Sequence, residues 1–167
     1  MVNLTNNFKF IIDNAEELTN SIKKPCRITF YISEHRSWEQ MKLPTFVENN
    51  IYKCIGPKPN IEIYHCKYKQ KYDLNFLQDI KQQYNIDNFV VACMSPGFEM
   101  NWHTDYFEGT RIHIPITTNE NCFIETEDIK INYLPNQVYE LDTSKKHTAY
   151  NFGKTNRLHL IGDVNAV

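Results

Sequence analysis

The pattern of hydrophobic and polar positions differs between the two halves of the chain. In the first 85 residues the pattern is mixed: residues 27–32 alternate as a strand does, and residues 73–84 repeat apolar side chains at helical spacing. A second short helix is predicted over residues 13–23, because Asp13 followed by Glu16 resembles a capping box. The first half is therefore expected to be a mixed α/β segment.

From residue 86 onward the chain consists of short runs rich in Val, Ile, Tyr and Phe, separated by turn residues. Strands are predicted over residues 88–95, 99–104, 110–117, 122–126, 129–133, 137–142, 147–152 and 157–164. Eight strands at this spacing suit a jelly roll. The predicted fold is thus mainly β, a single domain of residues 1–167 in which residues 86–167 form the core and residues 1–85 cover it.

Strand alternation separates two chemical faces. Arg111 and His113 alternate with isoleucines, and Arg157 and His159 alternate with leucines. If the polar face lines the barrel, the aliphatic face must be covered by other parts of the chain. The helices of the first half are the expected cover.

Composition agrees with a small enzyme. The 167 residues are enough for one domain that buries about 70% of its unfolded surface. A net charge of −2 without a long Lys/Arg run gives no reason to expect nucleic acid, and no run reaches the roughly 18 apolar residues of a membrane span. Five scattered cysteines without a C-x-x-C pair, and an N-terminus without the apolar core of a signal peptide, indicate a cytoplasmic protein.

Four residues of the second half form a pattern with chemical meaning: His103, Asp105, His147 and Arg157. His103 and Asp105 are two residues apart, so in an extended segment they point to the same face. Two imidazoles and one carboxylate on one side of a metal suit non-haem Fe(II) that must also bind O₂ and a co-substrate. Arg157 adds a planar cation that can hold a carboxylate through two hydrogen bonds. A surface His–Asp hydrogen bond and an exposed cation are the alternative interpretations.

These residues belong to a longer series of motifs. The series is Ser95-Pro96-Gly97, Trp102-His103-Thr104-Asp105, Arg111-Ile112-His113-Ile114-Pro115, His147 with Asn151, and Arg157 through Asp163. From Val90 to the C-terminus the chain resembles the double-stranded β-helix core of the Fe(II)- and 2-oxoglutarate-dependent oxygenases. It is most similar to the aspartyl/asparaginyl β-hydroxylase family, which includes bacterial proline hydroxylases. The resemblance implies a cupin-like jelly roll with N-terminal helices packed on one sheet.

The resemblance also implies a site and a reaction. The implied metal ligands are His103, Asp105 and His147. Arg157 would pair with the distal carboxylate of 2-oxoglutarate, and Arg111 and His113 would lie at the co-substrate and metal end of the site. Fe(II), 2-oxoglutarate and O₂ are then required, and the reaction is hydroxylation of an amino-acid side chain with release of succinate and CO₂. No catalytic residue beyond the metal ligands is implied.

The chain departs from the family at one position. Some members carry a serine about five residues before the Pro-Gly turn, where its hydroxyl helps to hold the far carboxylate of 2-oxoglutarate. Here that position is Ala92 or its neighbour Cys93. Another hydroxyl, such as that of a tyrosine, is expected to take over. Asn151, four residues after His147, is expected to order the site rather than to react.

The substrate is expected to be small. Tyr106 and Phe107 follow the metal ligands directly, and Arg36 could hold a substrate carboxylate. Much of the first half is needed to cover the sheet, so a compact pocket is expected for a free amino acid such as proline, or for Asp, Asn or Pro in a peptide segment. Two alternatives are open: the same chemistry on another small metabolite, and a cupin-like metal protein that is not an oxygenase. Arg157 at its fixed offset from His147 argues against the latter.

Overall fold

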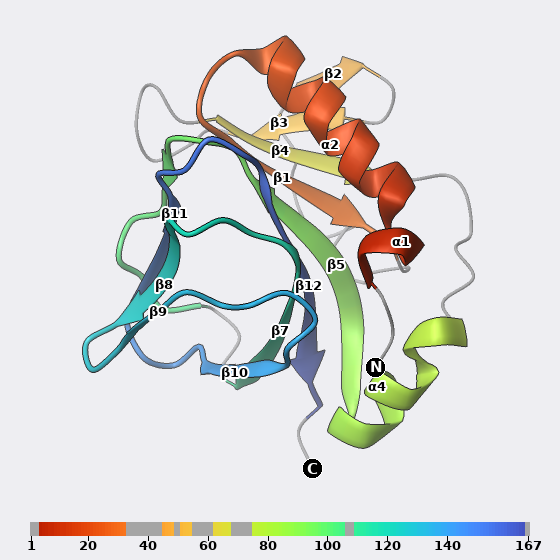
Figure 1. The fold of residues 1–167 in the computed structure, drawn as a ribbon, viewed down its shortest axis with the longest axis vertical. Coiled ribbons are helices and arrows are strands. Elements are labelled where there is room, and N and C mark those ends of the chain that lie inside the picture. The colour runs from red at the N-terminus through yellow and green to blue at the C-terminus, as the bar shows by residue number, and fades with distance from the viewer. Residues whose placement is uncertain are drawn as a thin grey trace.

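Two sheets and a layer of helices make up the molecule (Figure 1). The computed structural model describes residues 4–32, 45–48, 51–54, 62–67, 75–105 and 109–165. The larger sheet has eight strands and the smaller sheet has four. Helices pack on one face of the large sheet, and the small sheet lies over part of the other face. This confirms the predicted mainly β jelly roll with N-terminal helices on one sheet.

The large sheet combines strands from both halves of the chain. In order across the sheet these are β10 (Tyr139–Asp142), β7 (Thr110–Thr117), β12 (Arg157–Val164), β5 (Ile86–Met94), β1 (Cys26–Tyr31), β4 (Glu62–Lys67), β3 (Ile51–Cys54) and β2 (Thr45–Glu48). Only the β1–β4 pair among these neighbours is parallel in the described part of the chain. β5 pairs with β1 on one side and β12 on the other, so it joins the N-terminal strands to the core.

The small sheet is built from the second half alone. Its strands, in order, are β6 (Phe98–Glu99), β11 (His147–Asn151), β8 (Cys122–Thr126) and β9 (Lys130–Ile131). A compact apolar cluster lies between the two sheets, with Met94 and Leu141 from the large sheet against Phe98, Ile124 and Ala149 from the small one. This cluster fixes the distance between the sheets.

The helices cover the aliphatic face, as predicted from strand alternation. They are α1 (Leu4–Asn7), α2 (Lys9–Ile22), the 3-10 turn η1 (Asn75–Leu77) and α4 (Gln78–Tyr84). Their buried side chains share one hydrophobic core with the aliphatic residues of the strands. That core includes Leu4, Phe8, Ile11 and Ala15 from the first two helices, and Ile112, Ile114, Ile116, Leu158 and Leu160 from β7 and β12. α2 contacts β1, and α4 contacts β5 (Figure 1).

Helix α2 begins earlier than the sequence predicted. It starts at Lys9, so Asp13 lies inside the helix and forms an exposed ion pair with Lys9 at 3.0 Å. The predicted capping box is therefore wrong. Burial of Ile11 and Ala15 on one face extends the helix backward past Asp13, because packing outweighs a local capping signal. The helix ends where Lys23 adopts a left-handed conformation, with φ of 58°.

The first half also contributes more strands than expected. Residues 27–32 were predicted as a strand, which the structure confirms as β1, but β2, β3 and β4 were not predicted. The predicted strand 99–104 is short, because only Phe98 and Glu99 pair continuously as β6. The first half therefore extends the large sheet as well as covering it.

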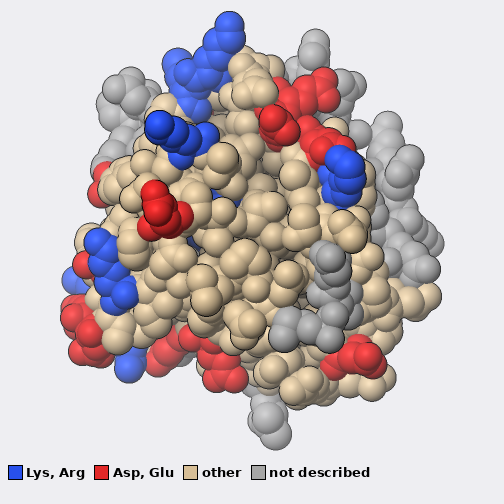
Figure 2. Space-filling view, viewed as in Figure 1, with Lys and Arg blue, Asp and Glu red and all other residues tan. Residues whose placement is uncertain are grey.

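The described surface and interior are consistent with the composition. The face seen in Figure 2 carries acidic and basic side chains around its periphery, and neither sign forms a continuous patch there. Cys26, Cys66, Cys93 and Cys122 are buried and unpaired. Among the described residues, every helix is too short or too polar to cross a bilayer.

Candidate metal centre

His103, from the segment His103-Thr104-Asp105 (the HxD motif), and His147, from β11, are brought together by backbone pairing. After β5 the turn at residues 95–97 reverses the chain, and Gly97, with φ of 84°, donates its N–H to Asn151 at 2.7 Å. The segment that follows then runs antiparallel to β11. His103 and His147 exchange backbone hydrogen bonds of 3.0 and 2.9 Å, and Asp105 N–H bonds to the carbonyl of Thr143 at 3.1 Å.

Asn151 supports this pairing and has a structural role. It is fully buried, and its Nδ2 donates to the carbonyl of Met94 at 2.9 Å and to that of Thr155 at 2.8 Å. Its Oδ1 accepts from Gly153 N–H at 3.0 Å. These bonds tie the end of β5, the end of β11 and the following turn together. The expectation that Asn151 orders the site agrees with these contacts.

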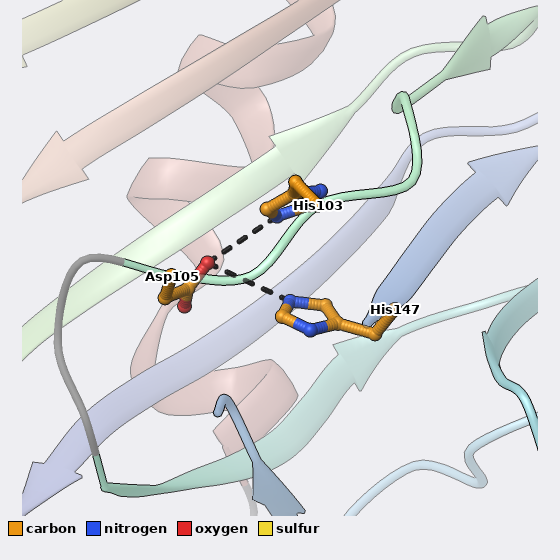
Figure 3. A group of neighbouring side chains, drawn as sticks. All are labelled: His103, Asp105 and His147. Atoms are coloured by element: carbon orange, nitrogen blue, oxygen red, sulfur yellow. Dashed lines mark ion pairs between the residues drawn. The ribbon is translucent and has the colours of Figure 1, made fainter. Parts of the chain in front are cut away.

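His103, Asp105 and His147 converge on one point (Figure 3). Asp105 Oδ1 lies 3.3 Å from His103 Nε2 and 3.6 Å from His147 Nε2. One donor atom from each residue falls within 4.8 Å of the others. Two ligands that each bind a metal at about 2.1 Å and at right angles are about 3 Å apart. The three donors are thus close to the spacing that a shared metal ion requires.

Both imidazoles are oriented by bonds on their other nitrogen. His103 Nδ1 lies 2.6 Å from the carbonyl oxygen of Asn101, and His147 Nδ1 lies 2.8 Å from that of Lys145. A carbonyl can only accept, so Nδ1 carries a proton in each ring and Nε2 is the atom directed at Asp105: a protonated ring donates from Nε2 to the carboxylate, and a neutral ring offers the Nε2 lone pair to a metal. This is the tautomer that a metal-binding histidine needs.

Asp105 is held as a carboxylate by its surroundings. Arg111 donates from Nη1 to Asp105 Oδ2 at 2.5 Å and from Nε to Asp163 Oδ1 at 2.7 Å. Burial raises the pKa of Asp105, but hydrogen bonds from the two histidines and the charge of Arg111 outweigh burial and hold that pKa far below its usual value. The pKa of His147 is raised, chiefly by its hydrogen bond with Asp105. Asp105 thus directs one oxygen to the histidines and the other to Arg111.

Arg157 is buried without a carboxylate partner among the described residues. It is 2% exposed, and burial lowers the pKa of its guanidinium to about 10. Its Nε and Nη2 lie 2.9 and 2.8 Å from the two ring nitrogens of His159, and its Nη1 lies 3.0 Å from the sulfur of Met94. A buried cation with only neutral neighbours is energetically costly, so an anion bound beside Arg157 would be stabilising. His159 is the immediate structural neighbour of Arg157.

A small cavity of about 60 Å³ connects the triad to this arginine. Its polar lining adds Arg27, Arg111, His113 and Arg157 to the three converging residues, and its apolar lining includes Met100, Ile124, Leu141 and Ile161. A wider hollow of about 320 Å³ also touches Ile124 and Leu141, so it lies next to this cavity. A larger hollow of about 500 Å³ lies between α2 and the turn at 153–156, away from the triad.

The structure describes six of the nine predicted site residues. The structure brings His103, Asp105 and His147 together and places Arg157, Arg111 and His113 on the same cavity. His113 is buried beside His159, with the two Nδ1 atoms 3.3 Å apart. The suggested substrate residues Tyr106, Phe107 and Arg36 lie outside the described residues.

Sequence reasoning missed two residues of the cavity region. Arg27 on β1 lines the cavity, and Asp163 on β12 binds Arg111. A signal for Arg27 was present, because it alternates with Ile28 and Phe30, which are buried under the helices. A basic residue at the opposite phase of a buried strand marks the inward face of the barrel. His65 on β4 is partly buried, and its Nδ1 lies 2.9 Å from the hydroxyl oxygen of Tyr31.

Comparison with known proteins gives an independent view of the whole chain. A sequence profile of the aspartyl/asparaginyl beta-hydroxylase family matches residues 5–166. The L-proline cis-4-hydroxylase of Rhizobium meliloti (strain 1021) is 38% identical over 80 residues, which make up 45% of this chain and 26% of that protein. The matched part thus spans about a quarter of that relative's length.

Solved structures with some likeness to the chain include cupins. A cupin domain from Bordetella pertussis matches 47% of this chain and 80% of its own at 19% identity, with a TM-score of 0.40. A predicted oxalate decarboxylase from Thermotoga maritima matches 53% of this chain and 74% of its own at 13% identity, with a TM-score of 0.40. The profile match over nearly the full length is what assigns the chain: it belongs to the aspartyl/asparaginyl β-hydroxylase family.

Proposed function

We propose that this chain is an Fe(II)- and 2-oxoglutarate-dependent dioxygenase that hydroxylates an amino-acid side chain. One observation carries the proposal. The buried guanidinium of Arg157, which has no carboxylate partner among the described residues, lines the same cavity as a His–Asp–His triad with correctly oriented imidazoles. A metal site and an anion site that share one small cavity fit a dicarboxylate that reaches from one to the other.

The donor set fits Fe(II). Two imidazole nitrogens and one carboxylate oxygen leave other coordination positions open, and this is the ligand set of non-haem Fe(II) oxygenases. His103 and His147 would bind through Nε2, and Asp105 through Oδ1, because their other polar atoms are already hydrogen-bonded. With 2-oxoglutarate and O₂, bound Fe(II) supplies the oxidising power that converts a C–H bond to C–OH, and 2-oxoglutarate becomes succinate and CO₂.

The chain's own residues position and shield the reactants. Arg157 would hold the distal carboxylate of 2-oxoglutarate through its planar fork, and His159 keeps that fork in place through 2.8 and 2.9 Å contacts. Arg111 keeps Asp105 ionised and directed at the metal position. Met100, Ile124, Leu141 and Ile161 give the cavity apolar walls that exclude water. No nucleophile or general base is needed from the protein.

Another hydroxyl could replace the missing serine at Ala92. Thr29 is paired directly opposite Ala92 across the β1–β5 register, and its buried hydroxyl has no hydrogen-bond partner among the described residues. The hydroxyl of Tyr133 is the alternative, because the ring of Tyr133 stacks against that of His159 with the two ring centroids 6.0 Å apart. The side-chain position supports Thr29, because directly opposed residues of an antiparallel pair lie on the same face.

The volume of an adjoining hollow and the activity of the matched relative both support a small substrate. The adjoining hollow of about 320 Å³ is of the size that small-molecule sites occupy. The matched relative is an L-proline cis-4-hydroxylase, so a free amino acid such as proline is the first candidate. Another small metabolite, or Asp, Asn or Pro within a peptide, would use the same chemistry. A cupin-like protein without oxygenase activity would leave the unpaired Arg157 unexplained.

The test measures co-substrate turnover. Purified protein with Fe(II), ascorbate and 2-oxoglutarate is incubated with each free L-amino acid, with peptides, and without substrate, and succinate and hydroxylated products are quantified by mass spectrometry. Succinate that depends on Fe(II) and rises with one substrate class is the expected result. Mn(II), Ni(II) or Co(II) should occupy the same ligands and inhibit. Absence of both metal binding and succinate formation would contradict the proposal.

A further inference from the structure

Arg27 is a third cation on the cavity, and it comes from the N-terminal half of the chain. It lies on β1, paired in register with Met94 of β5, which is in turn paired with Arg157 of β12. Adjacent strands are about 4.8 Å apart, so the backbones of Arg27 and Arg157 are about 10 Å apart on either side of Met94. Both side chains line the same cavity. The cavity therefore has two cationic side chains that come from different strands of the large sheet.

The Nε of Arg27 is buried and has no hydrogen-bond partner among the described residues. Burial and the charge of Arg111 lower the pKa of Arg27, while the charge of Asp105 acts in the opposite direction. Arg27, Arg111 and Asp105 all line the same cavity. An unpaired buried guanidinium N–H is unfavourable in the ligand-free protein and becomes favourable once an anion binds.

The other two arginines are already committed. Arg111 donates to Asp105 and Asp163, which makes it part of the metal-site scaffold. Arg157 is assigned to 2-oxoglutarate under the proposed function. If a divalent metal and the two carboxylates of 2-oxoglutarate balance each other, and Asp105 and Asp163 balance two of the arginines, one positive charge remains. Arg27 is the cation left for a further anionic group.

We propose that Arg27 binds the main-chain carboxylate of a free amino-acid substrate and so selects free amino acids over internal residues of a polypeptide. The assignment rests on the proposed function and adds a specificity-determining residue to it. A carboxylate held at Arg27 lies in the same cavity as His103, Asp105 and His147, so the rest of a small substrate can reach toward the metal position. An internal peptide residue has a neutral amide at this point and would leave the positive charge of the guanidinium without an anion, which disfavours it strongly.

The test compares carboxylates with carboxamides. Protein loaded with Mn(II) and 2-oxoglutarate is titrated calorimetrically with L-proline and then with the other free L-amino acids, each beside its carboxamide. The wild type should prefer the acid by on the order of 100-fold. Arg27→Gln should bind the acid on the order of 100-fold more weakly and bind the amide unchanged. Arg27→Lys should recover part of the preference, because it restores the charge without the fork.

Two controls separate this role from other causes. Lys24→Gln removes an exposed cation three residues away and should behave as the wild type does. Calorimetric titration of Mn(II)-loaded wild type and Arg27→Gln with 2-oxoglutarate alone, before any substrate is added, distinguishes a substrate residue from a co-substrate residue. Thermal unfolding of each variant checks the fold, and Arg27→Lys retains the charge if Arg27→Gln proves unstable.

Each contrary result has a distinct meaning. An unchanged preference for the acid in Arg27→Gln would place the substrate carboxylate elsewhere and overturn the assignment. A raised 2-oxoglutarate requirement in Arg27→Gln would make Arg27 a co-substrate residue, which also overturns it. Binding of peptides with no binding of any free amino acid would overturn the substrate class. Failure of the wild type to bind Mn(II) or 2-oxoglutarate would instead contradict the proposed function, and this is seen before any substrate is added.

Discussion

The two faces of the large sheet are built from the same strands and have opposite chemistry. On β7 and β12, the isoleucines and leucines at alternate positions join α1 and α2 in a continuous apolar core. The residues between them, which include Arg111, His113 and Arg157, line the cavity that leads to the metal triad. A displacement of one residue in strand register would exchange these roles. Stability and function are therefore interleaved along each strand.

The difference between the faces shows which one gains from ligands. The helix-covered face needs no ligand, because the aliphatic side chains there already pack against apolar neighbours. The cavity face contains groups that are unsatisfied without a ligand: Arg157 lacks a carboxylate, and the buried Arg27 Nε, Thr29 hydroxyl and His113 Nε2 lack hydrogen-bond partners among the described residues. The cavity face should thus lower the stability of the ligand-free protein and gain most on binding.

The largest expected effect comes from replacing a residue of the His103–Asp105–His147 triad. Replacement of His103, Asp105 or His147 by alanine should abolish divalent-metal binding and metal-dependent turnover, because each removes one of the three proposed ligands. The fold should persist, since none belongs to the main apolar core. Manganese binding, followed by electron paramagnetic resonance, provides the measurement. Thr104→Ala is the matched control, because Thr104 lies between two ligands and is exposed; loss of metal binding there would point to backbone damage instead.

Arg157 should show the conflict between function and stability most clearly. Arg157→Met should weaken 2-oxoglutarate binding by about 3–5 kcal/mol, which raises the concentration required by roughly two to four orders of magnitude, because a desolvated pair loses one partner. Arg157→Lys should recover little, since lysine lacks the planar fork. In the ligand-free state Arg157→Met should be at least as stable as wild type, because an unpaired buried charge is removed.

Chemical unfolding with and without 2-oxoglutarate measures both halves of the Arg157 prediction. An unchanged 2-oxoglutarate requirement in both variants would move the carboxylate site, with Arg111 as the next candidate. A strongly destabilised Arg157→Met protein would show instead that the arginine is structurally satisfied without a ligand. Either result would weaken the contrast between the two faces.

Leu158, the next residue on β12, should behave in the opposite way. It is 1% exposed in the main core, so Leu158→Ala should lower the free energy of unfolding by about 2–5 kcal/mol. The folded fraction should retain the wild-type affinity for metal and 2-oxoglutarate. Urea unfolding gives the first quantity and calorimetry the second. A large loss of 2-oxoglutarate affinity in correctly folded Leu158→Ala protein would show that the two faces are not independent.

How far the sequence predicts the molecule depends on how local each signal is. Alternation along β7 and β12 assigns the two faces correctly, because the periodicity of a strand is fixed by its geometry. The spacing of the HxD motif likewise places His103 beside Asp105. The partner strand is not a local property, yet the motif series places His147 correctly because the resemblance supplies the long-range contact. The triad was therefore predictable before the structure.

The features that were not predictable depend on distant packing. Helix α2 passes through its apparent capping box because Ile11 and Ala15 meet the large sheet, and no local signal encodes that contact. Arg27 joins the cavity only because β1 pairs with β5, which the spacing of residues does not reveal. Asp163 reaches Arg111 for a similar reason, since the two are paired in register across β7 and β12. The alternation along β1 thus indicates that Arg27 faces away from the helices, but not that this face reaches the site.

The smallest expected effect is a pH dependence from neutral histidines on the cavity side. Burial lowers the pKa of His113 and His159 well below 6.5, and burial with the charge of Arg27 lowers that of His65 to about 4. Below about pH 6.5 the unfolded chain therefore binds protons that the folded chain refuses, so stability is complete above that pH and falls as the pH drops. Each such histidine contributes about 1.4 kcal/mol per pH unit. His147 acts in the opposite sense, because Asp105 raises its pKa.

A comparison of metal-free wild type with His159→Gln, each unfolded in urea at three pH values between 7.5 and 5.5, isolates one of these contributions. The variant should lose stability less steeply below pH 6.5, whereas an identical slope would mean that His159 is protonated in the folded protein and that the cavity face already contains a counter-charge for it.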